Sequence, residues 1–188
     1  PAGERRATIR MAASPQVIVA YAKPNYPSPD DPPLSVAAEI LSGSKISPLY
    51  VELVKRRQLA AGIGNEEGPG NAYPNLLMFG ATVKAPHTTD QLLRAFDSVM
   101  DRFRRTGPTE EQLEIAKRSI GMSFLGHLQS SQSLALDFAS SELMYGSWKA
   151  SVEWYDKMSQ VTVEDVKRVT QKYLVPDRRT IATIERNQ

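Results

Sequence analysis

The sequence predicts a single α+β domain over residues 1–188, in which a mostly antiparallel sheet is covered by helices. Segments with the apolar pattern of strands lie before residue 85 and again near the C-terminal end, whereas residues 88–175 have the pattern of consecutive amphipathic helices. This partial segregation favours an α+β layer over a doubly wound sheet. A length of 188 residues also fits one domain with a sizeable core.

The composition excludes several classes of function. Twenty-three Lys and Arg against 21 Asp and Glu give a formal net charge of +2, too small to argue for nucleic acid or a membrane surface as partner. No Cys is present, so disulfides, thiolate catalysis and Cys-ligated zinc are excluded. No apolar run approaches the roughly 20 residues of a spanning helix. The chain begins at Pro1 rather than at Met, so we expect it to be part of a larger protein.

Five segments are predicted to be strands: residues 5–11, residues 16–22, a strand that begins at Leu59, residues 75–84 and residues 179–185. The segment 16–22 is almost continuously apolar (QVIVAYA), which predicts burial on both of its faces. The segment 75–84 is expected to pair antiparallel with the strand that begins at Leu59.

Residues 62–71 contain four glycines and two glutamates. A phosphate-binding loop needs glycines spaced as GxGxxG, or a Gly-Lys-Ser/Thr ending before a helix, and neither is present. The two glutamates would also repel phosphate. We therefore expect a hairpin loop here rather than a nucleotide site.

Two helices are expected before this glycine-rich segment. In the first, Asp31 serves as the cap, Pro32 takes the first helical position and Gly43 follows the end. The second helix leads directly into the strand at Leu59. Its buried face has the spacing i, i+3, i+4, i+7 and i+8 and comprises Ile46, Leu49, Tyr50, Leu53 and Val54.

Five further helices are expected between residues 88 and 175. Thr88 or Thr89 caps the first, Thr109 with Gln112 opens the second, and Thr162 with Asp165 opens the last. Between them lie helices over residues 131–145 and 148–158. The helix over 131–145 is predicted to bury Leu134, Ala135, Phe138 and Leu143, and three methionines are predicted to fill the core, namely Met78, Met100 and Met122.

Residues capable of catalysis are sparse. His87 and His127 are the two histidines of the chain, and neither has a second ligand at a metal-binding spacing. The motifs HExxH, HxxEH and GxSxG are all absent. Glu110 and Glu111 are adjacent carboxylates, but they occupy the first turn of a capped helix, where acidic residues stabilise the helix dipole. The residues alone therefore predict no catalytic or metal-binding residue in this chain.

The order of the elements nevertheless resembles a known family. Four stretches carry the resemblance, LSGSKISPLYVELVKRRQLAAGI, GPTEEQLEIAKRSI, LDFASSELMYG and YDKMSQVTVEDVKRVTQKYLVPDRRTIATI. Together they resemble the C-terminal half of the insulinase/pitrilysin-type zinc metallopeptidases, which include the mitochondrial processing peptidases. The resemblance runs from about Glu4 to Arg186 and implies the α+β fold of the metallohydrolase domains of that family.

The resemblance also implies partners and a cofactor. In such peptidases the zinc ligands and the glutamate base lie in an HxxEH motif on the N-terminal half, and the C-terminal half closes over a shared chamber. This chain is accordingly expected to hold no cofactor and to be inactive alone. Zinc is expected in an HxxEH-containing N-terminal domain or separate subunit, and peptides are the expected substrates.

Active members of the family place an Arg and a later Tyr on the C-terminal half, facing the substrate carbonyl. The resemblance puts Val54 at the Arg position and Ala61 at the Tyr position. Neither side chain can donate a hydrogen bond to a developing oxyanion. Val54 and Ala61 are therefore candidates for lining the chamber, without a catalytic role.

Three functions remain open at this point. The chain is a non-catalytic domain that forms part of a peptide chamber, or it is an inactive family member that serves as a scaffold or assembly subunit. The apolar pair Val54 and Ala61 motivates the second. The third is an unrelated small α+β binding module; salt-sensitive binding of RNA or DNA would support it, but the net charge of +2 argues against it.

Overall fold

A computed structural model describes residues 3–70 and 75–186 of the chain. The strands in this part are β1 (Arg5–Met11), β2 (Gln16–Lys23), β3 (Ala60–Gly68), β4 (Asn75–Val83) and β5 (Arg179–Arg186). The α-helices are α1 (Asp31–Ser42), α2 (Pro48–Tyr50), α3 (Thr89–Thr106), α4 (Glu110–Leu128), α5 (Ser131–Tyr145), α6 (Ala150–Ser159) and α7 (Val163–Tyr173). A π-helix, η1 (Val51–Arg56), continues α2, and a 3₁₀ turn, η2 (Pro176–Arg178), precedes β5.

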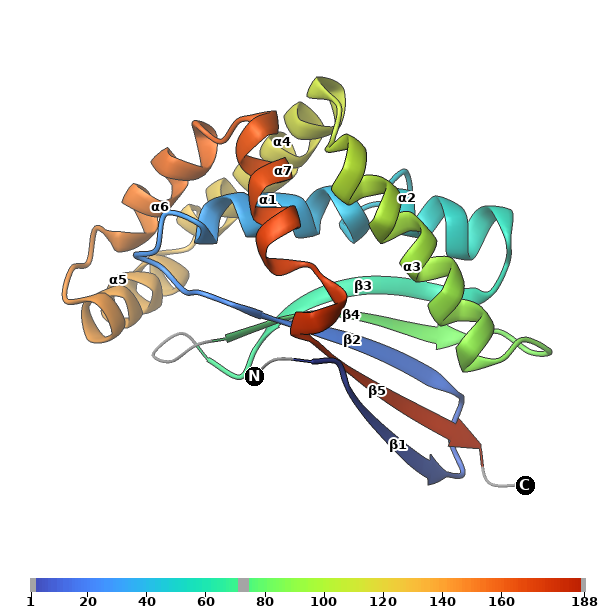
Figure 1. Cartoon of the computed structure of the whole chain (residues 1–188). Helices are drawn as coiled ribbons and strands as arrows, with labels where there is room; N and C mark the ends of the chain where they lie inside the picture. Colours follow the sequence, from blue (N-terminus) through green and yellow to red (C-terminus); the bar gives the residue numbers. More distant parts are fainter. Residues whose placement is uncertain (1–2, 71–74, 187–188) are drawn as a thin grey trace.

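The strands form one sheet with the order β1-β5-β2-β4-β3 (Figure 1). The outer pair β1 and β5 is parallel, and the other neighbouring pairs are antiparallel. The antiparallel pairing of β3 with β4 confirms the sequence prediction for these two segments. The fold is thus α+β with a mostly antiparallel sheet, as the sequence predicts.

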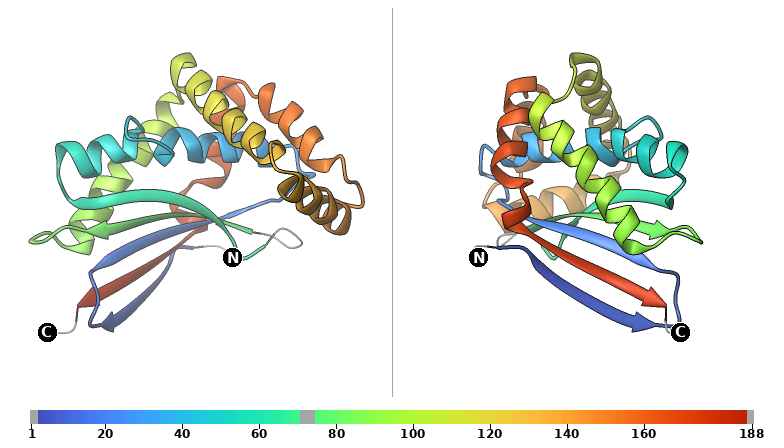
Figure 2. Two further views of the ribbon diagram at one scale, coloured as in Figure 1. Left: turned by 180° about the vertical axis from the view of Figure 1, so that it is seen from behind. Right: turned by 45° about the vertical axis from the view of Figure 1, so that its right-hand side comes forward.

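The helices lie on one face of the sheet and leave the other face open (Figures 1 and 2). Strand β2 shows the consequence, because Val17, Val19 and Tyr21 are buried under the helices while Ile18 is half-buried and Ala22 is exposed. The expectation that this segment is buried on both faces is therefore wrong. The apolar residues of β2 on the uncovered side do not reflect a second helical layer.

The core lies between the sheet and the helices. Helix α1 contacts α4, α6, α7 and β3, and it is surrounded more completely than a surface helix. Its side chains are buried around almost the whole circumference, namely Leu34, Val36, Ala37, Ala38, Ile40 and Leu41. An amphipathic helix on the surface would bury only one such face.

Local sequence signals fix most helix starts. Three predicted N-termini carry reciprocal capping boxes: Thr88 with Gln91, Thr109 with Gln112, and Thr162 with Asp165. Helix α1 differs, because Asp30 occupies the cap position and Asp31 is the first helical residue. Pro32 still lies within the first turn, where its missing N–H costs no helical hydrogen bond.

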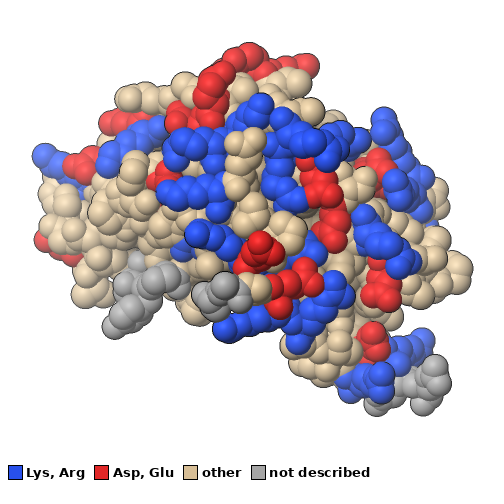
Figure 3. Space-filling view, viewed as in Figure 1, with Lys and Arg blue, Asp and Glu red and all other residues tan. Residues whose placement is uncertain are grey.

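Helix α5 and the second half of α4 are less buried than predicted. Ala135 is exposed, Leu143 is 86% exposed and Met122 is 72% exposed. These helices extend beyond the end of the sheet, so no described strand lies beneath part of them (Figure 1). In Figure 3, the surface at the lower left, over α5, is largely uncharged, whereas positive and negative side chains alternate over the remaining helices. Ile46 is a further exception, since it is 62% exposed.

The glycine-rich segment is mostly strand rather than loop. Strand β3 continues through Gly68, and Gly64 pairs with Gly80 of β4 across the ladder. A ladder is held by backbone hydrogen bonds, so these glycines can join it without side-chain packing. β3 and β4 do form a hairpin, but the prediction that its loop includes residues 62–68 is wrong, and residue 71 lies outside the described residues.

A buried carboxylate connects the start of α1 to α7. Asp30 accepts hydrogen bonds from Arg168 at 2.5 Å, Lys172 at 2.8 Å and the Tyr173 hydroxyl at 2.8 Å. Burial alone would raise the pKa of Asp30, but the hydrogen bonds from Lys172, Arg168 and Tyr173 outweigh it and lower the pKa. The ionised carboxylate is therefore the form that the fold stabilises.

This arrangement predicts a pH-dependent effect of Asp30→Asn. Because the folded pKa lies below the unfolded value of about 3.9, the stabilisation is present above that pH and is lost as the pH falls through the folded pKa. We expect the variant to lose about 1.5–3 kcal/mol of unfolding free energy at pH 7. The loss should shrink at pH 3, as measured by urea denaturation. The same change at exposed Asp156 is the control, and a loss of equal size at both pH values would contradict the assignment.

Candidate functional site

The open face of the sheet is the first candidate surface. Side chains alternate along a strand, and the register places Ile18 opposite Gly80 and Ala20 opposite Met78 on the face away from the helices. On the other side of β2, the same two residues face Ala182 and Thr180 of β5. Most side chains on this face are small or apolar, and no helix in the described part of the chain covers them (Figure 2).

The apolar character continues to the β1 edge. Ile9 pairs with Ile184 and is 59% exposed, and Met11 is 45% exposed. Charged residues on the same face lie toward its margins, at Arg5 of β1, Arg186 of β5 and Glu66 of β3. The centre of the face is therefore uncharged, which is unusual for a sheet surface in contact with water.

A shallow hollow of about 630 Å³ lies on this face where β2, β3 and β4 meet. Three of its lining residues are glycines, Gly62, Gly64 and Gly80, whose missing side chains account for the depression. Strand β3 is the last strand of the sheet, so the hollow adjoins an unpaired strand edge.

The structure separates the two chamber-lining candidates. Ala61 is exposed, sits at the irregularity between Ala60 and Gly62, and lines the hollow. Val54 is half-buried and packs against the hydrophobic core. That either residue lines a chamber remains a prediction.

The segment that contains Val54 and leads to Ala61 has an uncommon backbone. Val51–Arg56 is a π-helix, and Gln58 has a φ of 51°, the left-handed conformation that non-glycine residues seldom adopt. Together these features carry the chain from α2 into β3 and set where Ala61 emerges. The apolar spacing predicts a helix here, but it cannot distinguish a π-helix from an α-helix.

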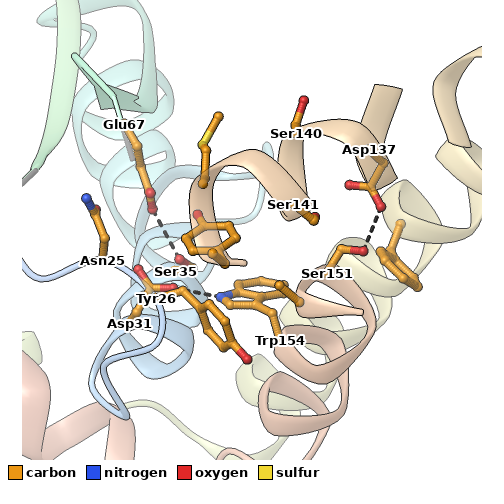
Figure 4. A pocket seen from close by; sticks show the side chains of 14 residues that line it. Asn25, Tyr26, Asp31, Ser35, Glu67, Asp137, Ser140, Ser141, Ser151 and Trp154 are labelled. Carbon is orange, nitrogen blue, oxygen red and sulfur yellow. Dashed lines mark hydrogen bonds between the residues drawn. The ribbon is translucent and has the colours of Figure 1, made fainter. Parts of the chain in front are cut away.

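A second candidate surface is a pocket of about 290 Å³ between α1, α5 and α6 (Figure 4). Its floor is a network around Lys23, whose side chain is 1% exposed. Lys23 Nζ lies 2.7 Å from Asp31 Oδ1 and 2.5 Å from Glu67 Oε2. Trp154 Nε1 donates to Asp31 Oδ2 at 2.7 Å, and Ser35 Oγ donates to Glu67 Oε1 at 3.1 Å. Every carboxylate oxygen of Asp31 and Glu67 thus has a partner.

The opposite side of the pocket carries a third carboxylate. Asp137 Oδ2 accepts a hydrogen bond from Ser151 at 2.6 Å, and no Lys or Arg of the described chain pairs with Asp137. Aromatic rings complete the walls, with Tyr26 and Tyr145 edge to face at 5.2 Å between centroids. Burial raises the pKa of Tyr145, and the negative charges of Asp31 and Glu67 raise it further. The pocket therefore has a negative electrostatic potential.

Sequence reasoning missed this pocket. Its lining comes from six separate segments, and its Trp154–Asp31 hydrogen bond spans 123 positions. The sequence pattern identifies Asp31 only as a helix cap and gives Lys23 no role. The one local signal was a buried-strand pattern that ends in a lysine, which requires a negatively charged partner elsewhere in the chain.

The residues first considered for chemistry remain apart from both surfaces. His87 lies in the loop after β4, His127 is exposed near the end of α4, and Glu110 and Glu111 are exposed in the first turn of α4. Among the described residues, no three His, Asp or Glu side chains gather as a metal site would require, so the residues do not fit a catalytic zinc. None of the described helices is long and apolar enough to cross a membrane.

Several solved structures have the same fold. A protease from Helicobacter pylori superimposes with a TM-score of 0.88 at 20% identity, and the match covers 97% of this chain but 44% of that one. The inactive peptidase domain of a candidate zinc protease from Bordetella parapertussis gives a TM-score of 0.83 at 24% identity, covering 93% of each chain. A peptidase M16 inactive domain from Pseudomonas fluorescens gives 0.83 at 20% identity, covering 100% of this chain and 44% of that one.

This chain therefore spans less than half the length of the Helicobacter and Pseudomonas proteins. No significant match was found among curated proteins. Residues 1–120 match the family described as "Peptidase M16 inactive domain". The chain therefore belongs to the peptidase M16 family, the insulinase-type zinc metallopeptidases, as one of its inactive C-terminal domains.

Proposed function

We propose that this domain forms one wall of a peptide-binding chamber and that an HxxEH-bearing partner, fused or separate, forms the catalytic side. The observation that supports this most strongly is the open sheet face. Its centre is small, apolar and uncharged, whereas a sheet face exposed to bulk water normally alternates with polar residues. Apolar patches of this kind mark surfaces that meet another molecule or enclose a ligand.

The side chains on this face support a role in shaping the chamber rather than in chemistry. Gly62, Gly64 and Gly80 keep the hollow open, and the Ala61 methyl cannot stabilise an oxyanion. When bound in the partner, zinc would supply an activated water molecule. This chain would contribute the surface against which an extended peptide lies.

A scaffold role is the second candidate. It is favoured by the absence of a donor at both Val54 and Ala61, because active members carry Arg and Tyr there. In that case the open face would bind a partner protein permanently, and the reconstituted pair would cleave no peptide.

The test is reconstitution with an HxxEH-bearing partner. We expect zinc-dependent peptide cleavage by the pair and none by this chain alone. Met78→Arg places a long cation on the open face and should lower cleavage by about tenfold or more. Met122→Arg, the same change on an exposed part of α4, should have no such effect.

Two results would contradict the chamber proposal. Cleavage by this chain alone would show that the partner is unnecessary. Unchanged cleavage with Met78→Arg, in a pair that still assembles, would show that the open face does not meet the peptide. A pair that assembles but is inactive toward every peptide tested would favour the scaffold.

A further inference from the structure

We propose that the pocket between α1, α5 and α6 binds an organic cation, an amine or guanidinium carried on a short aliphatic stem. The pocket lies on the helix-bearing side of the sheet, not on the open face, so this inference goes beyond the proposed chamber. It depends on the side chains of the pocket alone and does not require a catalytic partner.

The size of the pocket suits a small ligand. Its volume of about 290 Å³ lies at the lower end of the roughly 300–1,000 Å³ typical of small-molecule sites. Figure 4 shows Glu67 and Asn25 on one side, Asp137 and Ser151 on the opposite side, and the Trp154 indole between them. A short stem with one charged end can lie across the indole and reach Asp137.

The charge of the pocket selects a cation. Three carboxylates line it, Asp31, Glu67 and Asp137, while no Lys or Arg of the described chain does. Buried Lys23 lies between Asp31 and Glu67, so two negative charges remain without a counter-ion. Asp137 Oδ1 accepts no hydrogen bond from a described residue, so it is the oxygen available to a donor. An anion would be repelled, and a neutral ligand would leave the charge of Asp137 unpaired.

The aromatic walls favour the same class of ligand. Tyr26, Phe124, Tyr145 and Trp154 line the pocket, and cations bind favourably over such rings. The outside of this wall already shows the interaction, because Lys157 Nζ lies 4.8 Å from the centre of the Tyr26 ring. Tyr26 is held in position by its hydrogen bond to Glu153 at 2.9 Å.

The experiment uses the intrinsic fluorescence of the pocket. The chain has two tryptophans, so Trp148→Phe leaves Trp154 as the only source of tryptophan emission. Butylguanidinium should change its emission in a saturable way, while butylurea, the neutral analogue of similar shape, should bind about tenfold more weakly or not at all. Asp137→Asn should weaken butylguanidinium binding by about tenfold, because the unpaired carboxylate is removed. Asp156→Asn, on the same helix as Trp154 but exposed and outside the pocket, should not.

A second binding experiment, with a peptide as ligand, identifies the source of the cation. If an Ac-Gly-Arg-Gly-amide peptide binds more tightly than butylguanidinium, and its citrulline counterpart does not, the pocket recognises a basic residue of a polypeptide. Equal or weaker binding of the peptide assigns the pocket to a free cation.

Three results would overturn the proposal. They are a lack of saturable response to both guanidinium compounds, equal binding of butylurea, and unchanged binding by a folded Asp137→Asn variant. If circular dichroism shows that Asp137→Asn is unfolded, the comparison of butylguanidinium with butylurea binding to the parent chain decides whether the proposal holds. None of these measurements involves peptide cleavage, so the chamber proposal can fail while this one holds.

Discussion

Replacing Lys23 with Met is expected to lower the free energy of unfolding by about 3–5 kcal/mol at neutral pH. The Lys23 side chain is 1% exposed and lies between Asp31, which is 8% exposed, and Glu67, which is 34% exposed. Met keeps most of the aliphatic volume but removes the charge. Two carboxylates then face each other across a poorly hydrated space, and neither has another cation within reach among the described residues.

Urea denaturation of single and double variants measures this effect. Asp31→Asn keeps an acceptor for Trp154 Nε1 but removes one negative charge. The double variant Lys23→Met with Asp31→Asn should therefore be more stable than Lys23→Met alone, even though it carries one more substitution. A double variant that loses the sum of the two single losses would show that Lys23 acts through packing rather than charge.

This ion cluster has a structural role beyond its own energy. It joins the end of β2 to the start of α1 and to the end of β3. Asp31 of α1 and Glu67 of β3 line the cation pocket, so Lys23 holds these two walls in position without lining the pocket itself. Loss of butylguanidinium binding in Lys23→Met would thus follow from a change in shape.

The sequence predicts the elements of this fold well where the signal is local. A capping box needs two residues three positions apart; the helices predicted to start at Thr109 and Thr162 carry such boxes, and Thr88, one of the two predicted caps of the first helix, forms another. The change from a helical to an alternating apolar pattern near Leu59 likewise locates the junction between η1 and β3. Such signals depend on neighbouring residues and survive any tertiary arrangement.

Predictions of burial fail where they depend on which other element packs against a strand or helix. The residue type alone does not distinguish a sheet face covered by helices from an uncovered one. The apolar segment QVIVAYA therefore predicts burial on both faces. For the same reason Leu143 and Met122 were predicted to be core, although α5 and the end of α4 lie beyond the sheet. The pocket could not be predicted either, since Asp31, Asp137 and Trp154 meet through tertiary packing alone.

Phe79→Ala is expected to lower the free energy of unfolding by about 3–5 kcal/mol. Phe79 is 1% exposed in the centre of β4, where its ring lies 6.2 Å from that of Tyr21 and 5.8 Å from that of Phe96 in α3. Truncation would leave a cavity at the contact between sheet and helices and would remove both aromatic pairs.

The neighbouring Met78→Ala is the matched control, because its side chain points to the open face of the same strand. It should cost only about 1 kcal/mol or less, since few contacts are lost where no layer covers the sheet. Because helices cover only one face of the sheet, the two adjacent substitutions should differ widely in their effect on the free energy of unfolding.

Equal losses of unfolding free energy for Phe79→Ala and Met78→Ala would mean that the isolated chain already covers its open face, for example by self-association. Sedimentation of both variants and the parent would show this directly. If the parent is monomeric and the difference holds, the open face is free for the partner that the chamber requires.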